Sequence, residues 1–189
     1  PYSPQAEFTL PNLESYPVVW QGYLGLKTEF ATVQFHYVSG CKDLAKISLP
    51  TPSGGGNSSS VSNGGGGGPD SNMPALKIGQ RMRLEPSQLE GVTRKMTQAS
   101  EHCVLLALPC GKDTNDVELQ SRHLRSHFIT YLQLKAAAGI VNVAGSDDAN
   151  SYVVHVFPSC DFANETMGGI APDLLAKVAE IEHMVIIIA

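Results

Sequence analysis

Apolar side chains recur at every second position through most of residues 18–37, and this period of two restricts the fold more than any other feature of the chain. Two alternating runs, 18–27 and 31–37, flank a short break at Thr28 and Glu29. Successive side chains of a strand point to opposite faces, so the pattern predicts a β-hairpin with one buried face. Trp20 falls in the apolar register of the first run, and we expect it in the core rather than in contact with a ligand.

The same alternation returns in several later segments. Residues 76–84 predict one strand, with Ile78, Met82 and Leu84 on its core side and Lys77, Arg81 and Arg83 on the other. Further strand candidates are 103–108, 140–143, 152–157 and 184–188.

Three helices are predicted between these strands. Ser87 and Glu90 form a capping-box pattern at the start of the first helix. The second starts near Thr114 and stops at Gly139, a typical residue just beyond a helix end. The third starts at Pro172. Strands outnumber helices, so we expect a mixed α/β fold: a closed or nearly closed barrel with helices packed around it.

One segment departs from these patterns in composition. Residues 52–74 are almost wholly Gly, Ser, Asn and Pro. They have almost no apolar side chains whose burial could offset the conformational entropy lost on ordering the segment. We expect a disordered loop inserted between two strands. The rest of the chain is long enough for one core. We therefore expect an N-terminal extension over residues 1–11 and a single domain over residues 12–189, interrupted at 52–74.

Net charge, cysteine spacing and the absence of known motifs exclude several classes of function. The formal net charge of −5 argues against a broad nucleic-acid surface. The closing apolar run, 184–189, is too short to span a membrane. The four cysteines lack a Cys-x-x-Cys pair, which favours free thiols in a reducing compartment. Gly-x-Ser-x-Gly, His-Glu-x-x-His and Gly-x-Gly-x-x-Gly motifs are absent, so we expect no enzymatic activity and no cofactor.

Two functional roles for the histidines were considered, and the residue spacing supports neither. His123 and His127 are four apart on a predicted helix and could clamp a metal, but no third ligand follows from the spacing, which favours a solvated helix face. A hydrolase that pairs His102 or His155 with a cysteine has no support from spacing either. We expect neither a metal site nor a catalytic residue.

A cluster of basic residues is the strongest functional signal. Lys77, Arg81 and Arg83 share the non-core face of the predicted strand, with Arg94 and Lys95 on the helix after it. Arg81 and Arg83 would lie about 7 Å apart at a rise of roughly 3.3 Å per residue, which suits one phosphate or a pair of carboxylates. A barrel exterior decorated for solubility explains the same pattern equally well.

Several long blocks in this chain closely resemble the SPOC domain, the C-terminal domain of the split-ends/SHARP family of transcriptional repressors. The blocks are 16–27, 31–40, 80–85, 88–92, 105–111, 128–133 and 171–176, and the resemblance runs from about residue 12 to the end, without the insertion. It implies a distorted seven-stranded barrel with surrounding helices and a location in the nucleus.

The resemblance also implies partners. They are the acidic, serine-phosphorylated C-terminal tails of SMRT/NCoR-type corepressors, which recruit histone deacetylase complexes, or the phosphorylated tail of RNA polymerase II. Neither membrane binding nor direct DNA binding is expected. A barrel that binds single-stranded nucleic acid is the alternative, although this basic face shows few exposed aromatic residues.

By the same resemblance, the peptide-binding and phosphate-binding residues are Lys27, Lys77, Arg81, Arg83 and Lys135, with Tyr131 beside the phosphate. Tyr131 and Lys135 are one helical turn apart and project on one side. Lys77 stands where an Arg is expected in the vertebrate relative, which replaces a guanidinium fork by a point charge.

Overall fold

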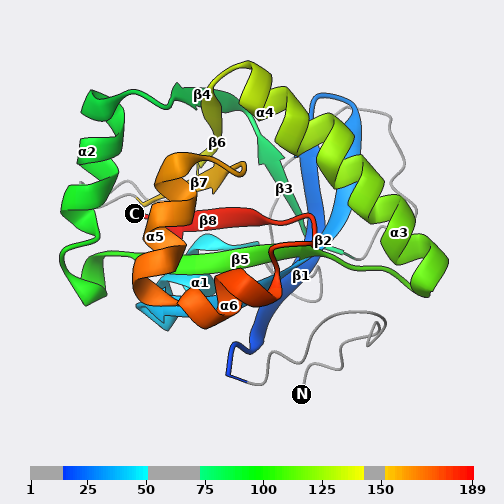
Figure 1. Cartoon of the computed structure of the whole chain (residues 1–189), viewed down its shortest axis with the longest axis horizontal. Coiled ribbons are helices and arrows are strands. Elements are labelled where there is room, and N and C mark those ends of the chain that lie inside the picture. The colour runs from blue at the N-terminus through cyan, green and yellow to red at the C-terminus, as the bar shows by residue number, and fades with distance from the viewer. Residues whose placement is uncertain (1–14, 51–72, 143–151) are drawn as a thin grey trace, which may run out of the picture.

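The computed structural model describes residues 15–50, 73–142 and 152–189 (Figure 1). Within these residues, the strands are β1 (Val18–Leu26), β2 (Glu29–Gly40), β3 (Ala75–Ile78), β4 (Gln80–Arg83), β5 (Cys103–Pro109), β6 (Ala137–Asn142), β7 (Val153–Phe157) and β8 (Met184–Ile188). The helices are α1 (Lys42–Ser48), α2 (Pro86–Lys95), the short turn η1 (Ala99–Glu101), α3 (Thr114–His123), η2 (Leu124–Ile129), α4 (Thr130–Leu134), α5 (Asp161–Ile170) and α6 (Pro172–Lys177). Most of the predicted insertion lies outside the described residues.

The strands form one sheet in the order β3-β1-β2-β5-β8-β7-β6-β4. β3 and β4 lie at opposite ends of this order, yet they follow each other in the chain with Gly79 between them. β3 pairs in parallel with β1, and β4 pairs antiparallel with β6. The Gly79 N–H donates a 3.1 Å hydrogen bond to the Ile140 carbonyl. The chain thus bends around Gly79 and nearly closes the sheet into a barrel, as expected for a mixed α/β fold with surrounding helices.

The prediction of one continuous strand over residues 76–84 is wrong. The chain exchanges its hydrogen-bonding partner at Gly79, from β1 on one side to β6 on the other. The described part of the sheet therefore has eight strands where seven were expected.

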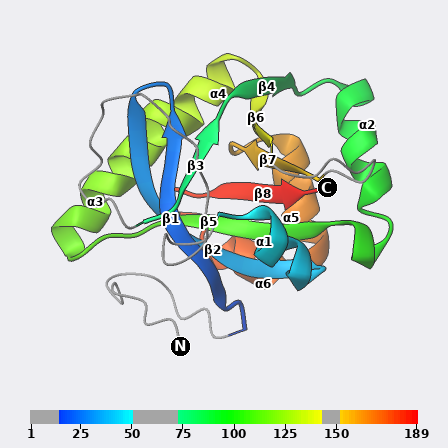
Figure 2. The same cartoon turned by 180° about the vertical axis from the view of Figure 1, so that it is seen from behind.

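The apolar residues of the sheet build two cores, one on each face. Along β5, Leu105 and Ala107 point into the barrel, whereas Val104 and Leu106 point out beneath α5 and α6. All residues of β5 are buried, which explains why its sequence is a continuous apolar run. The two views show α5 and α6 on one face of the sheet and α1 on the other (Figures 1 and 2).

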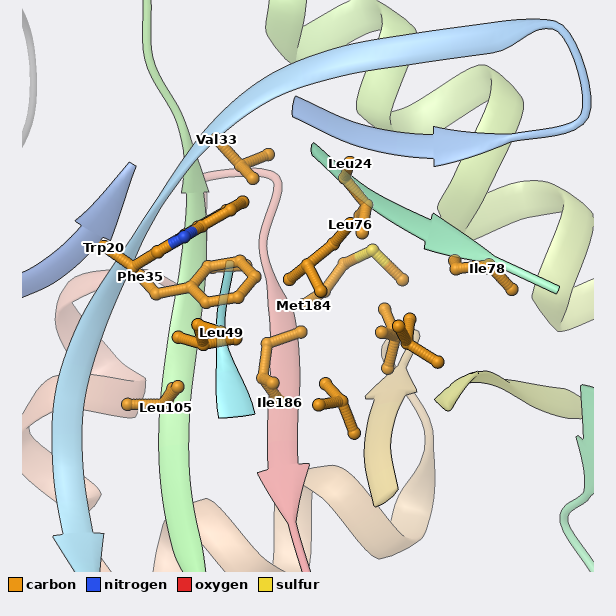
Figure 3. Packing of buried hydrophobic residues seen from close by; sticks show 14 of the residues in the cluster. Trp20, Leu24, Val33, Phe35, Leu49, Leu76, Ile78, Leu105, Met184 and Ile186 are labelled. Atoms are coloured by element: carbon orange, nitrogen blue, oxygen red, sulfur yellow. The ribbon is translucent and has the colours of Figure 1, made fainter. Parts of the chain in front are cut away.

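Trp20 lies inside the barrel, as its register predicts. Its side chain is 7% exposed, and its ring centroid lies 4.7 Å from that of Phe35 (Figure 3). The indole N–H donates a 2.8 Å hydrogen bond to the Pro50 carbonyl, so the polar atom of this buried ring is satisfied.

The second predicted helix ends earlier than expected. It runs through α3, the π-helical η2 and α4 to Leu134, and Gly139 belongs to β6 instead of terminating the helix. A Cβ at Gly139 would lie 2.8 Å from the Ile78 side chain. Close packing therefore accounts for this glycine. We call the place where β3 and β4, the two ends of the sheet, meet beside β6 the barrel seam. The actual helix end carries Ala136 in a left-handed conformation, with a φ of 46°.

Other helices also differ from the predictions. α2 starts at Pro86 with Glu85 as the residue before it, so the capping box at Ser87 is wrong, because proline already occupies the first turn. α1 and α5 were not predicted. α5 contains Gly168 and Gly169, which disfavour a helix, but Ala163 and Met167 are buried against the outer core. No helix in the described segments is long and apolar enough to cross a bilayer.

Candidate functional site

Tyr131 on α4 gathers three cationic side chains around its ring. The Lys27 Nζ lies 4.7 Å from the ring centroid, the Arg81 Cζ 5.7 Å and the Lys135 Nζ 6.0 Å. Arg81 also donates a 3.0 Å hydrogen bond from Nη1 to the Tyr131 hydroxyl. The negative face of an aromatic ring attracts such cations. We call Lys27, Arg81, Tyr131 and Lys135 the Tyr131 cluster.

The barrel seam explains why residues far apart in the chain meet here. Leu26 pairs with Ile78 between β1 and β3, which places Lys27 beside the bend at Gly79. Arg81 follows directly on β4, opposite Gly139 of β6. β6 begins just after α4, the helix that carries Tyr131. The cluster therefore depends on the near closure of the barrel.

A small pocket of about 200 Å³ opens at this seam. It is lined by Leu26, Lys27, Ile78, Gly79, Gln80, Arg81 and Tyr131. Pockets for whole small molecules are larger, about 300 to 1,000 Å³. The pocket is thus closer in size to a single side chain, and its lining combines two cations, a tyrosine and two apolar residues with no acidic residue.

Arg83 and Lys77 stand apart from the Tyr131 cluster. The Arg83 Nη1 lies 3.6 Å from the Glu85 Oε1, and both side chains are largely exposed, at 82% and 54%. Such a pair is weak and easily exchanged. Lys77 is exposed on β3, on the other side of Gly79 from the arginines. The prediction that Lys77, Arg81 and Arg83 share one face of one strand is therefore wrong for Lys77, because β3 and β4 are separate strands.

Sequence reasoning missed the pocket and the position of the turn that presents Lys27. The break was placed at Thr28 and Glu29, but the two loop residues are Lys27 and Thr28, since Leu26 pairs with Glu29. Lys27 came from the family resemblance alone. The sequence does contain a signal for the bend at the seam. An isolated glycine within an alternating apolar and polar pattern, such as Gly79, often marks an irregularity in a strand.

The cysteines and buried histidines do not form a catalytic pair. Burial raises the pKa of the Cys103 thiol to about 12 and that of Cys110 to about 11, so neither supplies a thiolate at neutral pH. His102 and His155 instead form hydrogen bonds with main-chain carbonyls, at Gln98 and Ile187.

His123 and His127 lie on one side of α3 and η2 with their ring centroids 5.6 Å apart. His127 Nε2 lies 3.6 Å from the Glu29 carboxylate, and His123 faces the Phe30 carbonyl. Across the described segments, no group of three or more ligating side chains could hold a metal ion.

Known proteins resemble this chain along nearly its whole length. The family model for the SPOC domain matches residues 11–189. Protein split ends of Drosophila melanogaster is 50% identical over 188 residues, which are 98% of this chain and 3% of that protein. Msx2-interacting protein of Homo sapiens is 47% identical over 179 residues, or 94% of this chain and 4% of that protein. The chain thus spans only a few per cent of the length of these relatives.

More distant proteins also match. Putative RNA-binding protein 15B of Mus musculus is 33% identical over 183 residues, which cover 89% of this chain and 18% of that protein. Among solved structures, the SPOC domain of human PHD-finger protein 3 aligns with a TM-score of 0.49 and 10% identity, over 91% of this chain and 95% of that chain.

Proposed function

This chain belongs to the SPOC domain family, and on that premise we propose that its Tyr131 cluster binds acidic peptides that carry phosphoserine. The chain is a protein-interaction domain and not an enzyme. Its ligand is therefore a segment of another protein rather than a substrate.

The observation that carries this proposal is uncompensated positive charge at the pocket. Lys27 and Arg81 line it, Lys135 approaches the same tyrosine ring, and no acidic residue belongs to the lining. A phosphoserine carries about −1.5 to −2 charges at pH 7 and three strong acceptor oxygens. It would satisfy a guanidinium, two ammonium groups and the Tyr131 hydroxyl together.

The partner that fits this site is the phosphorylated, acidic C-terminal tail of a SMRT/NCoR-type corepressor. Binding in the nucleus would bring histone deacetylase complexes to the chain that carries this domain. Close similarity to split ends and Msx2-interacting protein supports this assignment. The phosphorylated tail of RNA polymerase II has the same chemistry and is the second peptide to test.

Calorimetry with paired peptides tests the proposal. We expect a corepressor-tail peptide with phosphoserine to bind at least about tenfold more tightly than its unmodified form, because each charged hydrogen bond contributes about 1.5 to 3 kcal/mol. Arg81→Glu should abolish binding without unfolding the domain. Arg83→Glu and Lys77→Ala should have smaller effects, since neither residue joins the Tyr131 cluster.

Lys177→Glu is the matched control. Lys177 is exposed in the last turn of α6, which lies far from α4 in both views (Figures 1 and 2). It changes the net charge as Arg81→Glu does, so it should leave the affinity nearly unchanged. Equal affinity for both peptides, or full binding by Arg81→Glu, would contradict the proposal. Tight binding of a single-stranded RNA that Arg81→Glu abolishes would instead favour the nucleic-acid alternative.

A further inference from the structure

We propose that the peptide binds as an added strand along the open edge of β4, so that its main chain is recognised together with its charges. This inference rests on the proposed function and specifies how the ligand is bound. It follows from the hydrogen-bonding phase of β4 and from the side chains that the strand displays.

β4 has one strand partner among the described residues, and it ends the sheet. The Leu84 N–H donates to the Ala136 carbonyl, which continues the antiparallel register of β4 and β6 by one residue. In such a ladder, alternate residues direct their main-chain groups to the partner strand. Met82 therefore faces β6 with its N–H and C=O, whereas those of Arg81 and Arg83 point away from β6.

The same two residues carry the exposed cations of this edge. Arg81 is held by the Tyr131 hydroxyl, Arg83 makes only a long pair with Glu85, and Met82 between them packs against the outer core. β4 lies at the rim of the molecule between α2 and α4 in both views (Figures 1 and 2). Outward main-chain groups and positive side chains thus coincide along one short stretch of backbone.

Charge decides which strand can occupy this edge. A second copy of β4 would bring arginines opposite arginines, and like charges on neighbouring strands destabilise pairing. An extended acidic peptide has the opposite charge. In a strand, side chains two residues apart share a face at about 7 Å, the spacing of Arg81 and Arg83. The ligand should therefore carry its phosphoserine opposite the Tyr131 cluster and a second acidic residue two positions away.

Backbone methylation of the peptide tests this directly. The probe is a short extended peptide with one phosphoserine and an aspartate two residues later. Each variant has one amide N-methylated, so that charge and sequence stay constant. We expect affinity losses of about tenfold at every second position and little change between them, because only alternate N–H groups face β4. A uniform loss, or none, along the peptide would overturn the added strand.

Amide hydrogen exchange gives the matching measurement on the domain. On peptide binding, exchange at the Arg81 and Arg83 amides should slow by about tenfold or more, as each gains a hydrogen-bond acceptor. The Met82 amide, which already faces β6, serves as the internal control and should change little. Phosphate-dependent binding without this protection would refute the added strand and leave the proposed function standing. A failure of the phosphorylated peptide to bind would overturn both.

Discussion

Lys27 holds an unusual backbone conformation at the edge of the candidate site. Its φ is 57°, in the left-handed region that favours glycine, at the first position of the two-residue turn between β1 and β2. A residue with a Cβ costs roughly 1 to 2 kcal/mol there. The strained turn contributes to the candidate site, because it places the Lys27 ammonium 4.7 Å from the Tyr131 ring centroid. Strain that persists beside a charged cluster is typical of binding sites.

We therefore expect Lys27→Gly to separate stability from binding. The free energy of unfolding should rise by about 1 kcal/mol as the strain is relieved, while phosphopeptide affinity falls because one cation is lost. Urea denaturation and calorimetry measure the two effects. Thr28→Gly is the control, since Thr28 has no positive φ and gains nothing from glycine. A Lys27→Gly domain that is less stable than the natural one would contradict the strain argument.

Trp20 is a large buried side chain of the barrel interior, and its packing contributes to the stability of the domain. Trp20→Ala should cost about 3 to 5 kcal/mol, since it empties a large volume beside Phe35. Trp20→Phe should cost less, because a ring remains, although the Pro50 carbonyl loses its indole donor. Denaturation curves of the two variants rank these costs. A folded Trp20→Ala domain with unchanged stability and lost peptide binding would place Trp20 at the ligand instead.

The joint between α4 and β6 shows a second left-handed residue, Ala136. Its N–H donates to the Gln133 carbonyl, and its own carbonyl accepts the N–H of Leu84, the residue just after β4. The residue therefore follows the helix end and extends the pairing of β6 with β4 by one residue. Glycine is the usual residue in this position, because it lacks the Cβ that makes the conformation costly.

Ala136→Gly should stabilise the domain by about 0.5 to 1 kcal/mol, because strain relief outweighs the extra chain entropy. Ala136 is exposed, so no packing is lost. Ala176→Gly, on an exposed position of α6, is the opposite control and should destabilise by a similar amount. Thermal melts of both variants provide the comparison. The same sign for both changes would show that local φ does not govern Ala136.

Elements with a clear side-chain period could be predicted from the sequence, and elements fixed by tertiary contact could not. The β1–β2 hairpin and β8 follow their apolar patterns. Gly139 was read as a helix end, because the sequence does not reveal the Ile78 side chain packed against it. α5 was missed because its glycines oppose a helix that burial of Met167 favours.

At the scale of the molecule, the candidate site is a product of topology. Tyr131 and Lys135 could be paired from helical spacing alone, but nothing local to Lys27 or Arg81 brings them to the same ring. That requires β3 and β4 to join opposite ends of the sheet. Arg81 and Arg83 could be grouped by strand period, whereas Lys77 was placed on the same strand as the arginines because the partner change at Gly79 has no periodic signature.

Two buried histidines connect the stability of the whole barrel to pH. His36 and His155 are 5% and 8% exposed, on β2 and β7. Burial lowers the pKa of each below its usual value, only partly offset by hydrogen bonds to the Tyr16 and Ile187 carbonyls. Both histidines are therefore neutral in the folded domain at pH values where an unfolded chain begins to bind protons.

We expect the free energy of unfolding to fall as pH drops below about 6.5, the ordinary histidine pKa, because the unfolded state then binds more protons. Each histidine contributes a slope of at most about 1.4 kcal/mol per pH unit, which vanishes again below its folded-state pKa. Urea denaturation between pH 5.5 and 8 measures this slope above the range where carboxylates titrate. His36→Gln and His155→Gln should each flatten the curve. Stability that rises as pH falls, or a slope that survives both substitutions, would place the proton-linked groups elsewhere.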